Sequence, residues 1–135
     1  MLLALQAEVA VALQLAGDET SYRQDWRIRY AAERVIERVF QAAQAVPETR
    51  RERYFGSVGF QALRGIRNRL AHNYLAVDDD ILWESLSVDL PLVHDRLRPD
   101  AAAASVLIGE LMAGQDIDGE NWRRTHLGNI DPQGG

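Results

Sequence analysis

The spacing of apolar residues along the chain predicts helices almost throughout. In residues 1–16 apolar side chains recur at steps of three and four, as they do on the buried face of an amphipathic helix, and Gly17 marks its end. The same spacing continues through residues 28–46. There Asp25 is a predicted N-cap and Pro47 a predicted stop.

Two more helices are expected further along the chain. The third runs from Phe60 towards Tyr74, and the fourth covers residues 82–97 after an acidic turn at residues 78–80. Pro91 is expected to distort the fourth helix, because proline lacks a backbone donor. Since no stretch alternates between apolar and polar residues as a strand does, the pattern predicts an all-α fold: an antiparallel bundle of four to five helices.

The last third of the chain has a different composition. An alanine-rich stretch after Pro99 predicts a fifth helix that Asp100 caps. From Gln115 onwards turn-forming residues without periodicity predict a flexible C-terminal tail. We therefore predict a helical bundle domain over residues 1–99, followed by an extra helix and tail over residues 100–135.

Composition excludes several classes of site. The 135 residues include no cysteine, which rules out disulfides, zinc–thiolate sites, iron–sulfur clusters and thiol nucleophiles. No apolar run reaches the ~18 residues that a transmembrane helix needs. The apolar N-terminus lacks a preceding basic region and contains Glu8, which is atypical of a signal peptide. We expect a cytoplasmic protein without membrane contact.

Charge is unevenly distributed along the chain. The net charge is −5, yet residues 50–75 hold six arginines against one glutamate, and residues 76–100 hold seven acids against two arginines. Such a protein is not a general nucleic-acid coat, but its basic segment is suited to binding phosphate at one place. The alternative is that these arginines are solvated or paired with nearby acids.

One of the three histidines has neighbours that suggest chemistry. His94 lies in a leucine-rich stretch and is expected to be structural or at the surface, and His126 lies in the tail and is expected to be incidental. His72 is different, because Asn68 and Arg69, four and three residues before it, share its helix face.

Arg67 precedes His72 by five residues, which places it about 140° away around a regular helix. The two side chains therefore meet only at a frayed helix end or across the two-fold axis of a dimer. An arginine that neutralises phosphate and a histidine that moves a proton suit RNA cleavage, because RNA supplies its own 2′-hydroxyl nucleophile and no metal is required.

The stretch from Arg67 to Tyr74 reads R-x4-H-x-Y. It resembles the signature of HEPN-domain proteins, specifically the HepT-like toxins of two-component toxin–antitoxin pairs. The resemblance extends over residues 65–92, with an acidic turn and a following D-L-P, and over residues 30–47, which are similar to the family's long second helix. One departure is Phe40-Gln41-Ala42, where the family usually has Gly-Glu-Ala.

The resemblance implies a HEPN-like homodimer in which the two motifs face each other and form one composite ribonuclease site without a metal or other cofactor. By this resemblance Arg67 would bind and polarise the scissile phosphate, and His72 would act as general acid or base. Asn68 would orient His72 or the phosphate, and Arg64 and Arg69 would support RNA binding.

The resemblance also implies a partner. The family's antitoxin is typically a small MNT-type nucleotidyltransferase, which neutralises the toxin by transferring AMP from ATP to the motif tyrosine, Tyr74 in this sequence. A bulky anion there, beside Arg67, would block RNA sterically and electrostatically.

Two alternatives to a ribonuclease toxin remain open from the sequence. The chain is either a non-catalytic HEPN-like subunit that regulates a nucleotidyltransferase or binds its substrate, or a structural helical protein without a site. The last alternative predicts that the arginines of residues 50–75 pair with the acids of residues 76–100, and that His72 is buried.

Overall fold

The computed structural model describes the backbone of residues 1–72 and 77–126, and the side chains of residues 1–72 and 77–113. Over these ranges the chain is helical apart from short connections and contains no strand, which confirms the all-α prediction. The elements are α1 (Leu2–Leu15), α2 (Glu19–Gln24), α3 (Trp26–Ala45), α4 (Glu48–His72), α5 (Asp79–Glu84), the π-helical turn η2 (Ser85–Asp89) and α6 (Leu90–His126).

The contacts divide the chain into two compact units, Met1–Ala101 and residues 102–135. The assignment of a bundle domain to residues 1–99 and of an addition to residues 100–135 stays a prediction. None of the described helices combines the length and hydropathy needed to cross a bilayer.

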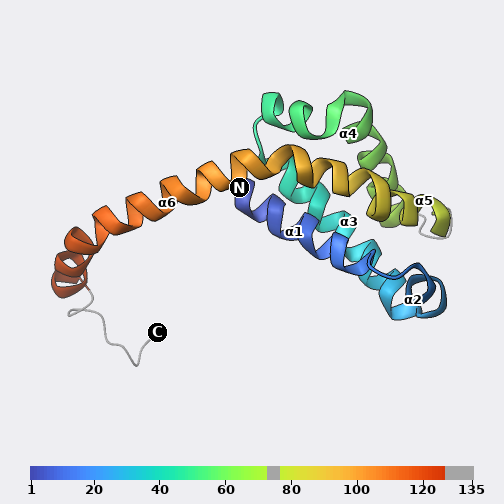
Figure 1. The fold of residues 1–135 in the computed structure, drawn as a ribbon, viewed down its shortest axis with the longest axis horizontal. Helices are drawn as coiled ribbons and strands as arrows, with labels where there is room; N and C mark the ends of the chain where they lie inside the picture. Colours follow the sequence, from blue (N-terminus) through green and yellow to red (C-terminus); the bar gives the residue numbers. More distant parts are fainter. Residues whose placement is uncertain (73–76, 127–135) are drawn as a thin grey trace. The chain divides into compact units, whose positions relative to one another are not determined.

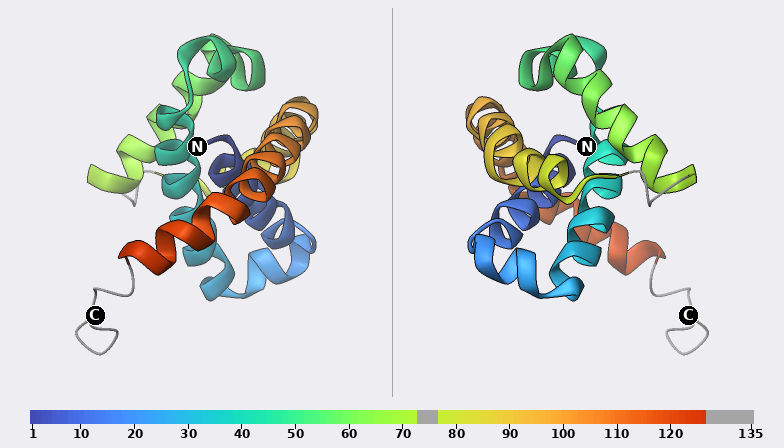
Figure 2. Two further views of the ribbon diagram at one scale, coloured as in Figure 1. Left: turned by 90° about the vertical axis from the view of Figure 1, so that its left-hand side faces the viewer. Right: turned by 90° about the vertical axis from the view of Figure 1, so that its right-hand side faces the viewer.

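Helices α1 and α3 form the centre of the first unit. They pack side by side after the chain reverses through α2, and α4 packs against α3 (Figures 1 and 2). The apolar face predicted for each helix is largely buried, since burial of such a stripe is what makes an amphipathic helix stable in water. The buried apolar residues that follow the spacing of these predicted helices are Leu2, Leu5, Val9, Ala12, Ala32, Val35, Val39, Val46, Phe60, Leu63, Ile66, Leu82, Leu86, Leu90, Val93 and Leu97.

Several helices begin or end at capping residues or prolines that can be recognised in the sequence. The Asp25 carboxylate accepts a hydrogen bond from the backbone N–H two residues on, at 3.0 Å, and α3 ends at Ala45, shortly before Pro47. Asp78 caps α5 in the same way at 2.7 Å. The short helix α2 was not predicted, although Asp18 caps it with a 3.0 Å hydrogen bond.

Helix α4 consists of two helical segments joined at Gly56. The backbone of Gly56 has φ 72° and ψ 158°, a conformation that side-chain-bearing residues rarely adopt. The chain therefore changes direction there, which Figure 1 shows as the sharp bend of α4. As a result Phe55, just before the bend, lies edge-on to Phe60, with ring centroids 6.0 Å apart.

The disturbance expected at Pro91 takes the form of the π-helical turn η2, which ends two residues before the proline. Proline removes one backbone donor and its ring clashes with the carbonyl one turn earlier, so the helix widens there. The hydroxyls of Ser85 and Ser87 donate to the carbonyls of Ile81 and Trp83, at 3.1 and 2.7 Å.

The prediction of a separate fifth helix is wrong. Helix α6 passes through Pro99 without ending. Asp100 does not cap a new helix, because its carboxylate accepts hydrogen bonds from the hydroxyl of Tyr54 at 2.5 Å and from Arg53 at 3.0 Å. The backbone is helical as far as residue 126, beyond Gln115, where the predicted tail begins. The last nine residues of the predicted tail, 127–135, lie outside the described residues.

The Tyr54–Asp100 contact makes stability depend on pH. The hydrogen bond from Tyr54, with the nearby charge of Arg53, holds the pKa of Asp100 below its usual value of 3.8. A carboxyl whose pKa is lowered by folding stabilises the protein above its unfolded pKa, and this contribution is lost as the pH falls through the folded pKa.

We expect Tyr54→Phe to lower the free energy of unfolding at pH 7 by about 1 kcal/mol, because a buried hydroxyl donor is lost. The deficit should shrink from pH 7 to a pH below the lowered pKa of Asp100, where the carboxyl is protonated in the wild type. Thermal unfolding at both pH values measures this. Tyr30→Phe is the matched control, since Tyr30 is 63% exposed. An equal deficit at the two pH values would contradict the assigned ionic character of the bond.

Candidate functional site

The basic segment lies on both sides of the bend in α4. Arg50, Arg51 and Arg53 precede Gly56, and Arg64, Arg67 and Arg69 follow it. Among these six, within the part of the chain that the structure describes, Arg53 alone forms an ion pair, with Asp100. The structural alternative predicted that the segment would be paired with the acids of residues 76–100. That expectation is wrong for five of its six arginines.

Arginines outside this segment are mostly paired. Ion pairs join Arg23, Arg27, Arg29, Arg34, Arg38 and Arg98 to Asp or Glu side chains at the surface. The positive charge on α4 is therefore a local feature of an acidic protein. A local field of this kind attracts anions even when the net charge of the protein is negative.

Two stacked phenylalanine rings lie beneath part of this charge. Phe40 from α3 and Phe60 from α4 are nearly parallel, with an interplanar angle of 12° and centroids 5.5 Å apart. The Arg67 guanidinium lies over Phe40 at 5.3 Å, and those of Arg51 and Arg64 lie over Phe60 at 4.6 and 5.3 Å. The structure thus brings three of the unpaired arginines onto one pair of rings.

Arg67 is the most constrained of these arginines. Its side chain is half-buried, and its Nη1 donates to the Oδ1 of Asn68 at 3.3 Å. Its Nε is buried and has no hydrogen-bond partner among the described residues. The Phe40 ring fills the place where the resemblance predicted a glycine, and it supports the Arg67 guanidinium rather than displacing it.

His72 is the last described residue of α4, and it is exposed, which contradicts the buried histidine that the structural alternative required. The helix is unbroken between Arg67 and His72, so the two point about 140° apart around its axis. A frayed helix end therefore does not bring them together within the described residues. Asn68 contacts Arg67, and Arg69 is exposed.

Tyr74, the predicted modification site, lies outside the described residues. The assignments of Arg67 and His72 as catalytic residues, and of Asn68, Arg64 and Arg69 as RNA-binding residues, stay predictions, as does the absence of a metal.

Neither the position of Arg51 nor the pairing of the two phenylalanine rings was predicted from the sequence. Arg51 belongs to the basic segment of residues 50–75, but nothing in its spacing singled it out from the other arginines there. The signal that was available is Gly56, since a glycine between two helical segments allows the first segment to turn back towards the second.

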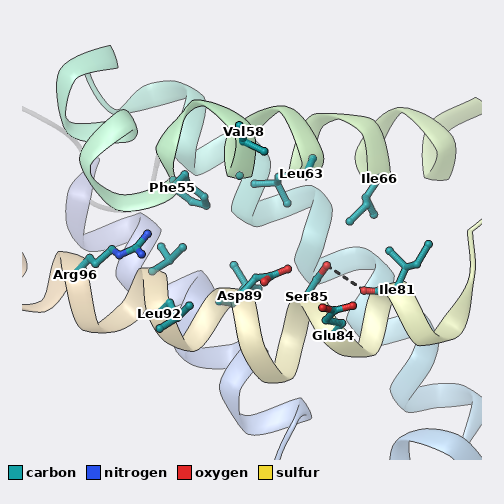
Figure 3. Close-up of a pocket in the computed structure, with 14 residues that line it drawn as sticks. Phe55, Val58, Leu63, Ile66, Ile81, Glu84, Ser85, Asp89, Leu92 and Arg96 are labelled. Atoms are coloured by element: carbon teal, nitrogen blue, oxygen red, sulfur yellow. Dashed lines mark hydrogen bonds between the residues drawn. The ribbon is translucent and has the colours of Figure 1, made fainter.

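A groove lies along another face of α4. Its volume is about 380 Å³, and its floor is apolar, while Val58, Ile81 and Leu92 at its sides are 83%, 44% and 50% exposed. Figure 3 shows it between α4 on one side and α5, η2 and the start of α6 on the other. Asp89 lies at the groove, and burial together with the charge of Glu84 raises its pKa.

Comparison with known proteins shows what the chain is similar to. The family model described as "Ribonuclease HepT-like" matches residues 6–99. Two proteins of Methanocaldococcus jannaschii, named "Putative RNase MJ1216" and "Putative RNase MJ0125", are each 34% identical to this chain over 64 residues. The match covers 47% of this chain and 52% and 54% of theirs, so it spans about half the length of these relatives. No solved structure matches significantly.

The family match covers well over half of the chain, and it includes all of α3 and α4 with the R-x4-H motif. The chain therefore belongs to the HepT-like ribonuclease family.

Proposed function

We propose that this protein is a metal-independent endoribonuclease toxin that cleaves RNA at a site which two copies of the chain build together. The observation that carries the proposal is a set of arginines, Arg67 among them, that form no ion pair with any described residue. They lie on the helix that ends in the exposed His72 of a HepT-like chain. RNA offers phosphate to the arginines and a proton to the histidine.

In the proposed reaction the 2′-oxygen of RNA attacks the neighbouring phosphorus, and the bond from phosphorus to the 5′-oxygen breaks. The 2′-hydroxyl loses a proton and the leaving 5′-oxygen gains one. His72 transfers one of these protons, and Arg67 neutralises the charge that develops on the phosphate oxygens. The products are a 2′,3′-cyclic phosphate and a 5′-hydroxyl end.

The proposed site needs a second chain because Arg67 and His72 diverge on one regular helix. A homodimer with α4 of each copy near the two-fold axis lets each chain supply one residue to the other. The groove beside α4 supports this proposal, since it exposes Val58, Ile81 and Leu92 together, and homodimers commonly bury such apolar surface.

We further propose that an MNT-type nucleotidyltransferase neutralises the toxin by modifying Tyr74. The tyrosine hydroxyl oxygen attacks the α-phosphorus of ATP, releases its proton, and pyrophosphate leaves. This part of the proposal rests on the sequence motif, in which Tyr74 follows His72 by two residues. The attached AMP would add negative charge near the arginines and compete with RNA.

Incubation of the purified protein with total RNA in EDTA tests the proposed reaction. We expect cleavage to persist, with 2′,3′-cyclic phosphate at the new 3′ ends, because neither proton transfer nor phosphate neutralisation requires a metal. Loss of activity in EDTA that returns with added magnesium would contradict the mechanism. The intact mass is measured first, so that a nucleotide already attached to the protein is not mistaken for intrinsic inactivity. An unmodified protein that does not cleave would favour the regulatory-subunit alternative.

A further inference from the structure

We propose that Arg51, Arg64 and Arg67, seated on the Phe40–Phe60 pair, form a strip that binds successive backbone phosphates of single-stranded RNA. This inference rests on the proposed function and deepens it, because it adds Arg51 and the two rings to the substrate-binding surface. We call these five residues the arginine–phenylalanine strip.

The first step of the argument concerns the hydrogen-bond donors of the three arginines. A ring beneath a guanidinium attracts its charge but offers no strong acceptor to the N–H groups at its edge. Apart from the Nη1 of Arg67, which donates to Asn68, the exposed donors at these edges stay available to a ligand. Arg34 and Arg98 differ, because they donate to the carboxylates of Glu37 and Asp95. Phosphate oxygens suit the edge of a guanidinium, which binds them in a bidentate manner.

The second step concerns the cost of the arrangement without a ligand. Three like charges gathered on two rings repel one another, and no described carboxylate forms an ion pair with any of them. The buried Nε of Arg67 also has no partner among the described residues. A polyanion that neutralises these charges and accepts hydrogen bonds from the accessible N–H groups of the guanidiniums therefore gains binding energy.

The third step is that the bend at Gly56 is required for Arg51 to take part. Arg51 and Arg64 are thirteen residues apart, on either side of Gly56, yet both lie over Phe60. Tyr54 holds the first segment of α4 in place, since its hydroxyl donates to Asp100 and its carbonyl accepts from Arg96 at 3.2 Å. The strip is thus a supported surface rather than three independent side chains.

Salt dependence of RNA binding tests the proposal. Each phosphate that a protein contacts on a single strand contributes about 0.7 to the slope of log Kd against log salt concentration. We expect Arg51→Ala and Arg64→Ala each to lower this slope by about 0.7 and to weaken binding at low salt. The probe is a fluorescently labelled oligouridylate, measured by anisotropy with all variants carrying His72→Ala, so that no cleavage interferes.

Arg34→Ala and Arg98→Ala are the matched controls, because each removes an exposed arginine that is already paired with a carboxylate. We expect both to leave the slope unchanged. Phe60→Leu keeps most of the apolar volume and all three charges, and we expect it to weaken binding because the guanidiniums of Arg51 and Arg64 lose their supporting ring. Circular dichroism melts confirm that every variant is folded at the assay temperature.

A slope that Arg51→Ala and Arg64→Ala change no more than the two controls would overturn the strip. ATP can also be used as a competitor of the RNA. If ATP displaced the RNA equally well from the wild type and from the two variants, the strip would likewise be overturned, because the RNA would then bind at another surface. Cleavage by the protein with intact His72 is scored separately. Cleavage with unchanged slopes rejects the strip alone, whereas lowered slopes without cleavage reject the ribonuclease proposal and leave the strip standing.

Discussion

Replacing His72 with alanine is expected to lower the rate of RNA cleavage by at least about 100-fold, since a positioned general acid or base typically contributes 10²–10⁴. RNA binding should change little, because the arginines that contact phosphate remain. His94→Ala is the control, as it removes a half-buried histidine of α6, on a different helix from the motif. Single-turnover cleavage of a labelled RNA measures the effect.

Mixing two inactive variants tests directly whether the site is composed of residues from both chains. Arg67→Ala lacks the phosphate-binding residue and His72→Ala lacks the proton-transfer residue. In a mixed dimer one of the two composite sites receives both intact residues, one from each chain. After subunit exchange we expect about a quarter of the wild-type activity, because half of the dimers are mixed and each has one intact site.

Recovery of activity in the mixture requires that Arg67 and His72 act across the dimer. If both residues served the same site from one chain, every site in the mixture would lack one of them and activity would stay at background. Sedimentation of the two variants at micromolar concentration shows first that each is a dimer. A monomer that retained full activity would also refute the composite site.

Removal of the Tyr22 side chain is expected to have the largest effect on stability. Tyr22 is fully buried, its ring lies 5.0 Å from that of Trp83, and its hydroxyl donates to the Asp79 carbonyl at 2.9 Å. We expect Tyr22→Ala to lower the free energy of unfolding by about 3–5 kcal/mol, as for other large aromatic residues of protein cores. Thermal and urea unfolding measure this.

Tyr22→Phe separates the hydroxyl from the ring. We expect a loss of about 1–2 kcal/mol, since the Asp79 carbonyl loses a donor while the packing remains. This variant also keeps the experiment informative if Tyr22→Ala does not fold. If Tyr22→Phe lowered the free energy of unfolding as much as Tyr22→Ala, packing of the ring would not be the main contribution of Tyr22 to stability.

Ionisation of the Tyr22 hydroxyl is expected to make the stability of the protein depend on pH in the alkaline range. Burial, with the charge of Asp79, raises the pKa of Tyr22 to about 12 from an ordinary value of 10. A pKa raised by folding stabilises the protein below the unfolded pKa, and this contribution is lost as the pH rises from 10 through about 12. Stability of Tyr22→Phe should therefore fall less steeply over that range than stability of the wild type.

The sequence alone determined the main helices of the first unit and most of their buried faces. Leu82, Leu86, Leu90, Val93 and Leu97 are all buried as their spacing predicted. Periodicity is sufficient here because a helix that exposes one apolar stripe to water gains stability only by burying that stripe. Caps such as Asp25 and Asp78 were equally predictable, because the groups they satisfy lie two residues away.

The sequence also identified the helix that carries the candidate site, because the R-x4-H-x-Y spacing is local. It predicted from the angle between residues five apart that Arg67 and His72 diverge, and the unbroken helix between them agrees with this. Their meeting across two chains stays a prediction.

Only the tertiary structure decided which side chains from distant parts of the chain meet. In the fold Arg51 lies over Phe60, and Arg67 lies over Phe40. The Asp100 carboxylate accepts a hydrogen bond from Tyr54. These contacts depend on the bend at Gly56 and on the packing of α4 against α3. Periodicity tells which face of a helix is buried, but the partner of that face is selected by the whole fold, through contacts between residues far apart in the sequence.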